Sequence, residues 1–231
     1  MIGWKTCAIV GACALAAVPA TAGPAKGNAE RVLAAARPAV SPAMSLAPAM
    51  LGTTALPIRA ERFVVELARA RQDNRFHPAI QRLIAPARGL AALDKLDFVQ
   101  KAVNRRVRWM SDTTLWGRHD YWATAAETLD KGAGDMEDRA IVKMQALRAM
   151  GFAPSDLFLT LARDRVGGPM TVLTARIGDR YYVLDDSGST PFDSERRRIE
   201  FAPLMSFGLA GAWMHVARAV LPRTSMAAAR Q

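Results

Sequence analysis

The chain has 231 residues and is basic, with 31 Lys and Arg against 21 Asp and Glu and a formal net charge of +10. Hydrophobic residues make up 51% of the sequence and charged residues 23%, which excludes a mainly disordered chain and suffices for one domain with its own core. The positive charge favours an anionic partner: nucleic acid, lipid headgroups or an acidic polysaccharide.

The first 22 residues have the three parts of a secretory signal peptide. Lys5 gives a positive start, an apolar run covers residues 6–18, and Ala20-Thr21-Ala22 is a typical cleavage site. This run is shorter than the roughly 20 residues that a membrane-spanning helix needs. A lipoprotein acylated at Cys13 is the alternative. We predict a periplasmic or secreted protein, which has no access to nucleic acid.

Both cysteines of the chain lie inside this predicted signal peptide, at Cys7 and Cys13. Cleavage after Ala22 would leave a mature chain without a thiol. Such a chain has no disulfide, no thiolate metal ligand and no thiol nucleophile.

Residues 23–57 are rich in Ala and Pro and are predicted to be a tether, followed by one domain over 58–220 and a tail over 221–231. The domain should begin with helices. Apolar residues at helical spacing predict one over 59–71, one from Pro78 and one over 93–110. In the first of these, Phe63, Val64, Leu67 and Ala70 share a face. Residues 111–131 are predicted to be a loop-rich stretch whose aromatic side chains pack on the core.

The best-defined helix should run from Asp135 to Met150. Asp135 can cap it, with Asp138 three residues on as in a capping box, and Gly151 can end it. The apolar period then changes to two, which predicts strands over 157–161, 170–177 and 180–185. The two residues 178–179 make the last pair a hairpin. Helices followed by an antiparallel sheet, with a central helix packed on it, are an α+β fold.

The hairpin register and the central helix define three positions of interest. If Ile177 pairs with Arg180, Met170 is a diagonal neighbour of Asp185 on one face of the sheet. Met136 lies in the first turn of the central helix, where the helix dipole would stabilise a thiolate. The scaffold therefore has places for a nucleophile, a base and an orienting carboxylate, but only Asp185 suits its role.

Segments spread over residues 93–215 share a further pattern. The most specific are Asp120-Tyr121-Trp122-Ala123-Thr124, Gly132-Ala133-Gly134-Asp135-Met136-Glu137-Asp138, Val183-Leu184-Asp185-Asp186 and Pro203-Leu204-Met205-Ser206-Phe207-Gly208. In this order they resemble the bacterial transglutaminase-like cysteine peptidases, periplasmic proteases that clip biofilm adhesins. The resemblance implies a papain-like, transglutaminase-like core with Trp122 and Asp186 in the substrate cleft.

The resemblance also implies that the catalytic groups are incomplete. In the family, the helix begins Gly-Asp-Cys-Glu-Asp, a His begins the strand after a variable loop, and an Asp lies in a Leu-Asp-Asn segment. The corresponding residues here are Met136, Met170 and Asp185. Asp186 replaces the Asn, and Arg139 replaces an aromatic residue. A thioether neither ionises to a nucleophile nor carries a proton, so we expect the fold without the peptidase activity.

Acidic residues flank the missing cysteine. Adhesin-clipping members of the family depend on calcium, and the resemblance places this ion at Asp135 and Glu137, with Asp138 near. Carboxylate oxygens suit Ca²⁺. The simpler interpretation is that these acids cap the helix and complement its dipole.

Three functions remain open from the sequence. The first hypothesis is a pseudoenzyme that binds or regulates an envelope protein or peptide segment, such as an adhesin or a membrane-bound regulator. The second is an active hydrolase or transferase of the same fold with a non-thiol nucleophile. The third is a structural envelope protein whose basic surface contacts an anionic polymer. A copper site between Met136 and Met170 is an alternative to plain packing of these side chains.

Overall fold

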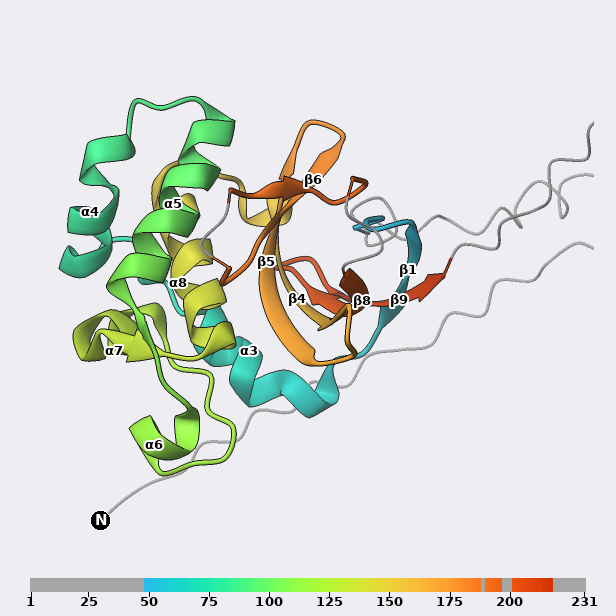
Figure 1. Ribbon diagram of the computed structural model, residues 1–231, viewed down its shortest axis with the longest axis horizontal. Coiled ribbons are helices and arrows are strands. Elements are labelled where there is room, and N and C mark those ends of the chain that lie inside the picture. The colour runs from blue at the N-terminus through green and yellow to red at the C-terminus, as the bar shows by residue number, and fades with distance from the viewer. Residues whose placement is uncertain (1–47, 188–189, 197–200, 218–231) are drawn as a thin grey trace, which may run out of the picture. The chain divides into compact units, whose positions relative to one another are not determined.

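The computed structural model describes residues 48–187, 190–196 and 201–217 (Figure 1). The predicted signal peptide, residues 23–47 of the predicted tether and the predicted tail lie outside the described residues. Within the described part of the chain, every helix is too short or too polar to cross a membrane.

A seven-stranded antiparallel sheet forms one layer of the domain, with the strand order β1-β9-β8-β4-β5-β6-β7. Its strands are β1 (Thr53–Ile58), β4 (Leu157–Asp164), β5 (Pro169–Ile177), β6 (Arg180–Leu184), β7 (Phe192–Asp193), β8 (Phe201–Phe207) and β9 (Ala212–Ala217). The predicted hairpin is confirmed, because β5 and β6 pair Ile177 with Arg180. The register on which the site argument depends is therefore the one that the sequence predicts.

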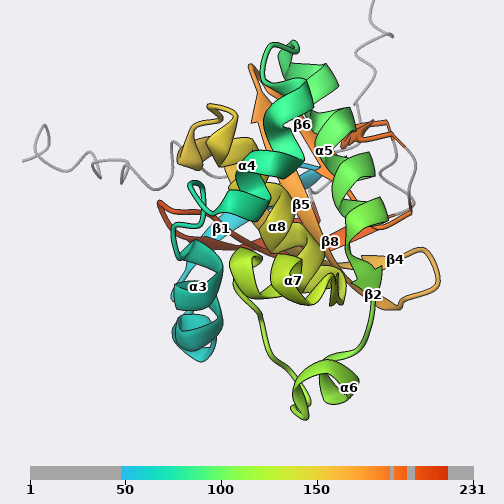
Figure 2. The ribbon, with the colours of Figure 1, turned by 90° about the vertical axis from the view of Figure 1, so that its left-hand side faces the viewer.

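Helices form the second layer, with α8 between the sheet and the other helices (Figures 1 and 2). Helix α8 contacts β4 and β5 on one side and α4, α5 and α7 on the other. The helices are α3 (Val64–Arg71), α4 (Pro78–Ile84), α5 (Ala92–Arg106), α6 (Asp112–Trp116), α7 (Ala125–Lys131) and α8 (Met136–Ala149), with short 3-10 turns at Glu61–Phe63, Ala85–Ala87 and Pro154–Asp156. This arrangement confirms the predicted α+β fold with a central helix on an antiparallel sheet.

Helix α8 is buried on almost every side, since each residue from 138 to 147 is buried. The predicted inward face of Ala140, Met144 and Leu147 is part of this set. The same surroundings also bury Arg139 and Lys143, and charged groups at such positions need partners.

Two boundaries between residues 93 and 131 differ from prediction. Helix α5 ends at Arg106, and the chain continues into β2 (Arg108–Trp109), which pairs in parallel with β3 (Ala133–Gly134). The stretch predicted to be loop-rich contains α6 and α7. Helix α7 begins with a complete capping box, in which Thr124 and Glu127 bond each other's backbone N–H. Local capping therefore forms a helix where the apolar period gives no signal.

The folded domain begins earlier than predicted. Residues 53–57 were assigned to the tether, but they form most of β1, which pairs with β9 as the sheet's first strand. A strand whose partner lies some 160 residues away in the sequence leaves little local trace. Val64 of α3 is also 62% exposed, although its spacing places it on the apolar face with Leu67.

Candidate functional site

The nucleophile position opens helix α8. Asp135 is the N-cap and its Oδ1 accepts a bond from the Asp138 backbone N–H at 3.5 Å. Met136 is the first helical residue and is partly exposed. The place that the sequence predicts for a dipole-stabilised thiolate is therefore present, and a thioether occupies it.

The base position lies near the start of β5. Met170 and Asp185 line one open pocket of about 450 Å³, together with Val166 and Phe201 among others. This agrees with the diagonal relation that the register predicts. The structure therefore puts Met170 and Asp185 around the same pocket. Met136 is not among the described residues that line this pocket.

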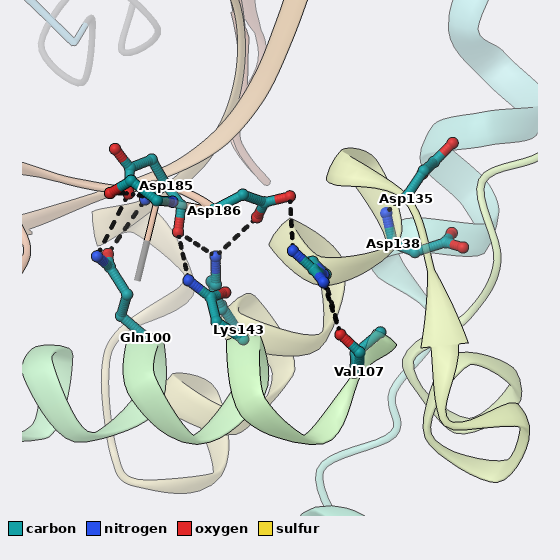
Figure 3. A network of polar contacts seen from close by, with 10 residues as sticks. Gln100, Val107, Asp135, Asp138, Lys143, Asp185 and Asp186 are labelled. Atoms are coloured by element: carbon teal, nitrogen blue, oxygen red, sulfur yellow. Dashed lines mark hydrogen bonds and ion pairs between the residues drawn. The ribbon is translucent and has the colours of Figure 1, made fainter. Parts of the chain in front are cut away.

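Asp185 is firmly held at the end of β6 (Figure 3). Its N–H donates to Gln100 Oε1 at 3.1 Å, and its Oδ1 accepts from the Ser187 N–H at 3.0 Å and Oγ–H at 2.6 Å. Its carbonyl oxygen accepts from Lys143 Nζ at 2.7 Å and from Asn104 Nδ2 at 3.0 Å. Asp185 is buried, and these bonds fix both its backbone and its carboxylate.

Asp186 lies between two cationic side chains of α8 (Figure 3). Arg139 Nη1 lies 3.2 Å from one carboxylate oxygen, and Lys143 Nζ lies 3.3 Å from the other. Arg139 also donates twice to the Val107 carbonyl, at 3.1 and 2.8 Å. The Lys143 side chain is only 1% exposed, and this burial lowers its pKa while Asp186 opposes the shift. Sequence reasoning missed Lys143, because nothing local marks a lysine as buried.

Five carboxylates converge beside the first turn of α8. Oxygens of Asp112, Asp135 and Asp138 lie within 4.8 Å of one another, as do oxygens of Asp112, Asp120 and Glu137. Sequence reasoning found the three that flank position 136 and missed Asp112 and Asp120. These two come from the stretch between α5 and α7, which only the tertiary structure brings to α8.

The electrostatics of this cluster favour a bound cation. Burial, then the neighbouring acids, raises the pKa of Asp135 to about 6 and the pKa values of Glu137 and Asp138 to about 8. Asp138 Oδ2 and Asp112 Oδ1 are buried with no hydrogen-bond partner among the described residues. Helix capping alone leaves these oxygens unsatisfied, whereas a hard cation such as Ca²⁺ would satisfy them. The residues therefore fit the ion that the resemblance implies.

Gly134 is required by the position of Asp138. A Cβ atom at Gly134 would lie 2.6 Å from Asp138 Oδ2 and 2.7 Å from its Cβ. The Asp138 side chain is held against the backbone of Gly134 because its Oδ1 accepts a hydrogen bond from the Ala123 N–H at 2.8 Å. The glycine in the Gly-Asp-Met-Glu-Asp segment thus makes room for an acidic side chain of the cluster.

Comparison with known proteins decides the family. The family model described as bacterial transglutaminase-like cysteine proteinase BTLCP matches residues 53–219. The chain belongs to this family. No curated protein sequence gives a significant match.

Solved structures of the family support the assignment. Legionella pneumophila LapG is 25% identical with a TM-score of 0.52, over 69% of this chain and 90% of LapG. The calcium-bound form of LapG is 27% identical with a TM-score of 0.52, over 68% of this chain and 88% of that one. The EGTA-treated form matches similarly, at 25% identity and a TM-score of 0.52, over 69% and 87% of the two chains. The transglutaminase-like core that the sequence predicts is therefore confirmed.

Two departures from the pattern expected for this family contact each other. Arg139 stands where the resemblance described above implies an aromatic residue, and Asp186 stands where it implies Asn. In the structure these two side chains form an ion pair. Asp186 therefore supplies a carboxylate that the buried Arg139 binds.

Trp122 does not line a cleft, in contrast to its predicted role in this transglutaminase-like fold. It is 3% exposed and its ring lies 6.2 Å from Phe63 and 6.4 Å from Phe207. Its large apolar ring is needed in the core between the helices and the sheet. Arg139 and Lys143 bind the carboxylate of Asp186, and the place of Asp186 in a substrate cleft stays a prediction.

A Ser–His contact that sequence reasoning missed does not restore a hydrolase. Ser206 Oγ lies 2.8 Å from His215 Nε2, but Ser206 is fully buried. The other ring nitrogen bonds Thr53 Oγ1 at 2.9 Å, where a catalytic triad would have a carboxylate. Burial lowers the pKa of His215 to about 4. A neutral, enclosed imidazole of this kind suits a structural role.

Proposed function

We propose that this protein is a catalytically inactive transglutaminase-like cysteine peptidase homologue that acts as a binding or regulatory module of the cell envelope. The observation that carries this proposal is the presence of thioether side chains at the expected nucleophile and base positions. Met136 begins α8 and Met170 shares a pocket with Asp185. The surrounding scaffold is intact, which supports retention for binding rather than decay of the domain.

The sequence supplies the rest of the proposal. The predicted signal peptide supports a periplasmic or secreted location. The family resemblance points to a protein or peptide segment as partner, such as an adhesin or a membrane-bound regulator. The basic composition favours an acidic partner surface or an anionic polymer.

Inactivity is tested with a matched gain-of-function variant. We expect the exported form, from Gly23, to leave unfolded acidic test proteins uncut, because Met136 cannot form a thiolate. The double variant Met136→Cys/Met170→His should instead react with iodoacetamide at least about tenfold faster than a free exposed cysteine, since a helix N-terminus lowers a thiol pKa. Cleavage by the unmodified protein, with metalloproteases inhibited, would refute the proposal and favour a non-thiol nucleophile.

We further propose that the five-carboxylate cluster binds calcium in this protein. Asp112, Asp135 and Asp138 would hold the ion, and Asp120 and Glu137, which form a second such group with Asp112, are further candidate ligands. The ion would supply positive charge to a group of buried carboxylates that otherwise repel one another. The supporting observations are the unsatisfied oxygens of Asp112 and Asp138 and the calcium-bound structure of LapG.

Calcium binding is tested by thermal unfolding in chelator and in excess calcium. A ligand present at about 100 times its dissociation constant stabilises the folded state by roughly 2.7 kcal/mol. We expect the midpoint to rise by several degrees with Ca²⁺, and the rise to disappear in Asp138→Asn. Asp94→Asn is the matched control, because Asp94 is an exposed acid in the first turn of α5. An unchanged midpoint of the native protein in calcium would leave these acids as capping residues only.

A further inference from the structure

Residues of α3 and of the turn that joins β8 to β9 line a groove; Figure 1 labels these elements. Its wide part is open, with a volume of about 670 Å³, and is lined by residues 58–61, Val64 and Ala212 among others. A narrow pocket of about 10 Å³ adjoins it and reaches Met144 and Phe207. Both parts share Leu67 and Arg71, so they form one continuous surface. The narrow end has room for about one methyl-sized group.

The walls of this groove carry apolar side chains that the described residues leave uncovered. Val64 lines it and is 62% exposed, and Leu209 at the turn is 49% exposed. The next residue of α3, Val65, is 67% exposed. Helical spacing puts Val64 on the same face as buried Leu67, so the apolar face of α3 continues beyond the core. Clustered exposed apolar groups of this kind mark interaction sites.

Two arginines, Arg71 and Arg148, give the groove a positive charge that Glu61 of its lining only partly balances. Arg71 Nη2 donates to the Gly208 carbonyl at 2.6 Å, and Arg148 Nη1 donates to Gln145 Oε1 at 3.0 Å. Neither forms an ion pair with a described residue. Arg148 Nε is buried and has no hydrogen-bond partner in the described part of the chain. Burial lowers the pKa of both guanidinium groups, and Asp73 opposes this shift at Arg148. An arriving anion would compensate for part of the solvation that the two charges have lost.

We propose that this groove binds an extended segment of a partner protein in which a carboxylate stands next to an apolar side chain. The carboxylate would pair with Arg148 and Arg71, and the apolar side chain would cover Val64 and enter the narrow pocket. The open shape suits a polypeptide, and three cationic residues (Arg59, Arg71 and Arg148) against Glu61 make the lining net positive. Charge complementarity therefore selects an acidic segment.

This surface is separate from the thioether site. Met144 and Arg148 follow Met136 by 8 and 12 residues on α8, which puts them roughly 12 to 18 Å further along the helix axis. The proposal therefore stands independently of the calcium site and of the question of catalysis. A partner bound at the groove would leave the N-terminus of α8 accessible.

The test uses the full chain and fluorescein-labelled decapeptides, with fluorescence anisotropy as the readout. A peptide of alternating Leu and Glu should bind at least tenfold more tightly than a Leu/Gln peptide and a Ser/Glu peptide. Arg148→Gln and Val64→Ser should each weaken its binding by about tenfold, equivalent to about 1.4 kcal/mol. Arg105→Gln, which removes an exposed charge from α5, should change the dissociation constant less than twofold. Circular dichroism melts establish that each variant is folded.

Four outcomes would overturn the proposal. Equal weakening by Arg105→Gln would mean attraction to the basic surface in general. Equal binding of the Leu/Gln peptide, or of the Ser/Glu peptide, would mean that the pairing of charge and apolar group is not recognised. If decanoate displaces the Leu/Glu peptide at a decanoate concentration below the dissociation constant of the peptide, the groove would be assigned to a free amphiphile. Absence of binding up to 1 mM peptide would remove the acidic segment as its occupant.

Discussion

The Asp186 carboxylate is the anion that makes two buried cations of α8 tolerable. Arg139 and Lys143 would each be costly to bury alone. Asp186 binds both, and the Val107 carbonyl accepts from Arg139. This network also fixes the end of β6, because Lys143 donates to the Asp185 carbonyl. Asp185 therefore keeps its place even though the thiol and the imidazole expected in this family are missing.

The coupling of Arg139 and Asp186 predicts strongly non-additive stabilities. Asp186→Asn alone should lower the free energy of unfolding by about 3 kcal/mol, because it leaves the buried Arg139 and Lys143 without a carboxylate. Arg139→Phe alone should lower it by less, because Lys143 still pairs with Asp186. The double variant should lose about 1–3 kcal/mol less than the sum of the two. Urea denaturation of the four proteins measures this difference.

Arg180 and Asp193 are the matched control for this cycle. They also form an ion pair, at 3.4 Å, but the Arg180 side chain is 60% exposed. Solvent screening should hold the coupling in Arg180→Gln/Asp193→Asn below about 0.5 kcal/mol. A coupling between Arg139 and Asp186 no larger than this would contradict the predicted non-additivity.

At the scale of elements, a buried chain of hydrogen bonds ties five strands together. Thr53 of β1, His215 of β9, Ser206 of β8, Thr160 of β4 and Thr174 of β5 bond in this order. Thr53 Oγ1 donates to the Met50 carbonyl, so it accepts from His215 Nδ1–H. The neutral imidazole then accepts from Ser206 at Nε2. If His215 were protonated, Nε2 could no longer accept a hydrogen bond from Ser206, and a positive charge would be buried in the sheet.

Acid should therefore weaken the sheet through His215. The folded pKa of about 4 lies below the ordinary value of 6.5, so the unfolded chain binds more protons between these values. Preferential protonation of His215 in the unfolded chain therefore lowers the free energy of unfolding as the pH falls from 6.5, by about 3 kcal/mol at pH 4. Urea denaturation of the native protein and of His215→Asn from pH 7.5 to 4 measures it.

The informative quantity is the difference between the two pH profiles, because carboxylates also titrate in this range. His215→Asn should be less stable at pH 7.5, since it loses part of the chain, but its stability should fall less on acidification. Parallel profiles for the two proteins would mean that His215 is protonated as easily in the folded state as in the unfolded state.

At the scale of the whole molecule, a basic protein concentrates five of its acids in one cluster. The chain as a whole has a net charge of +10, yet burial and repulsion between neighbouring acids raise the pKa values of Asp135, Glu137 and Asp138. Without calcium, the folded state holds these protons more tightly than the unfolded chain. The cluster therefore lowers stability as the pH rises from the ordinary carboxyl range to about 8.

Calcium binding should release protons. Glu137 and Asp138, with pKa values near 8, carry protons at pH 7 in the absence of the ion, and Ca²⁺ takes ionised ligands. We expect about one to two protons released per ion at pH 7, and affinity that increases by at least about tenfold between pH 6 and 8. Titration calorimetry in buffers of different ionisation enthalpy measures the release. Calcium binding with no proton release at pH 7 would contradict the raised pKa values.

Much of this protein follows from local sequence signals. Helix α8, its cap at Asp135 and the β5–β6 register follow from periodicity, a capping residue and a two-residue turn, which act over a few residues of chain. The absence of a thiol from the predicted mature chain follows from the positions of Cys7 and Cys13 inside the predicted signal peptide. The places of Met136, Met170 and Asp185 in helix and strands follow from these same elements.

Only the tertiary structure decided what surrounds these residues. Asp112 and Asp120 join the acidic cluster from a stretch with no helical period, β1 pairs with a strand some 160 residues away, and Trp122 enters the core. The burial of Lys143 and its contact with Asp186 likewise depend on packing between α8 and β6. Burial and long-range contact are properties of packed elements, so patterns over a few residues determine the elements but not their neighbours.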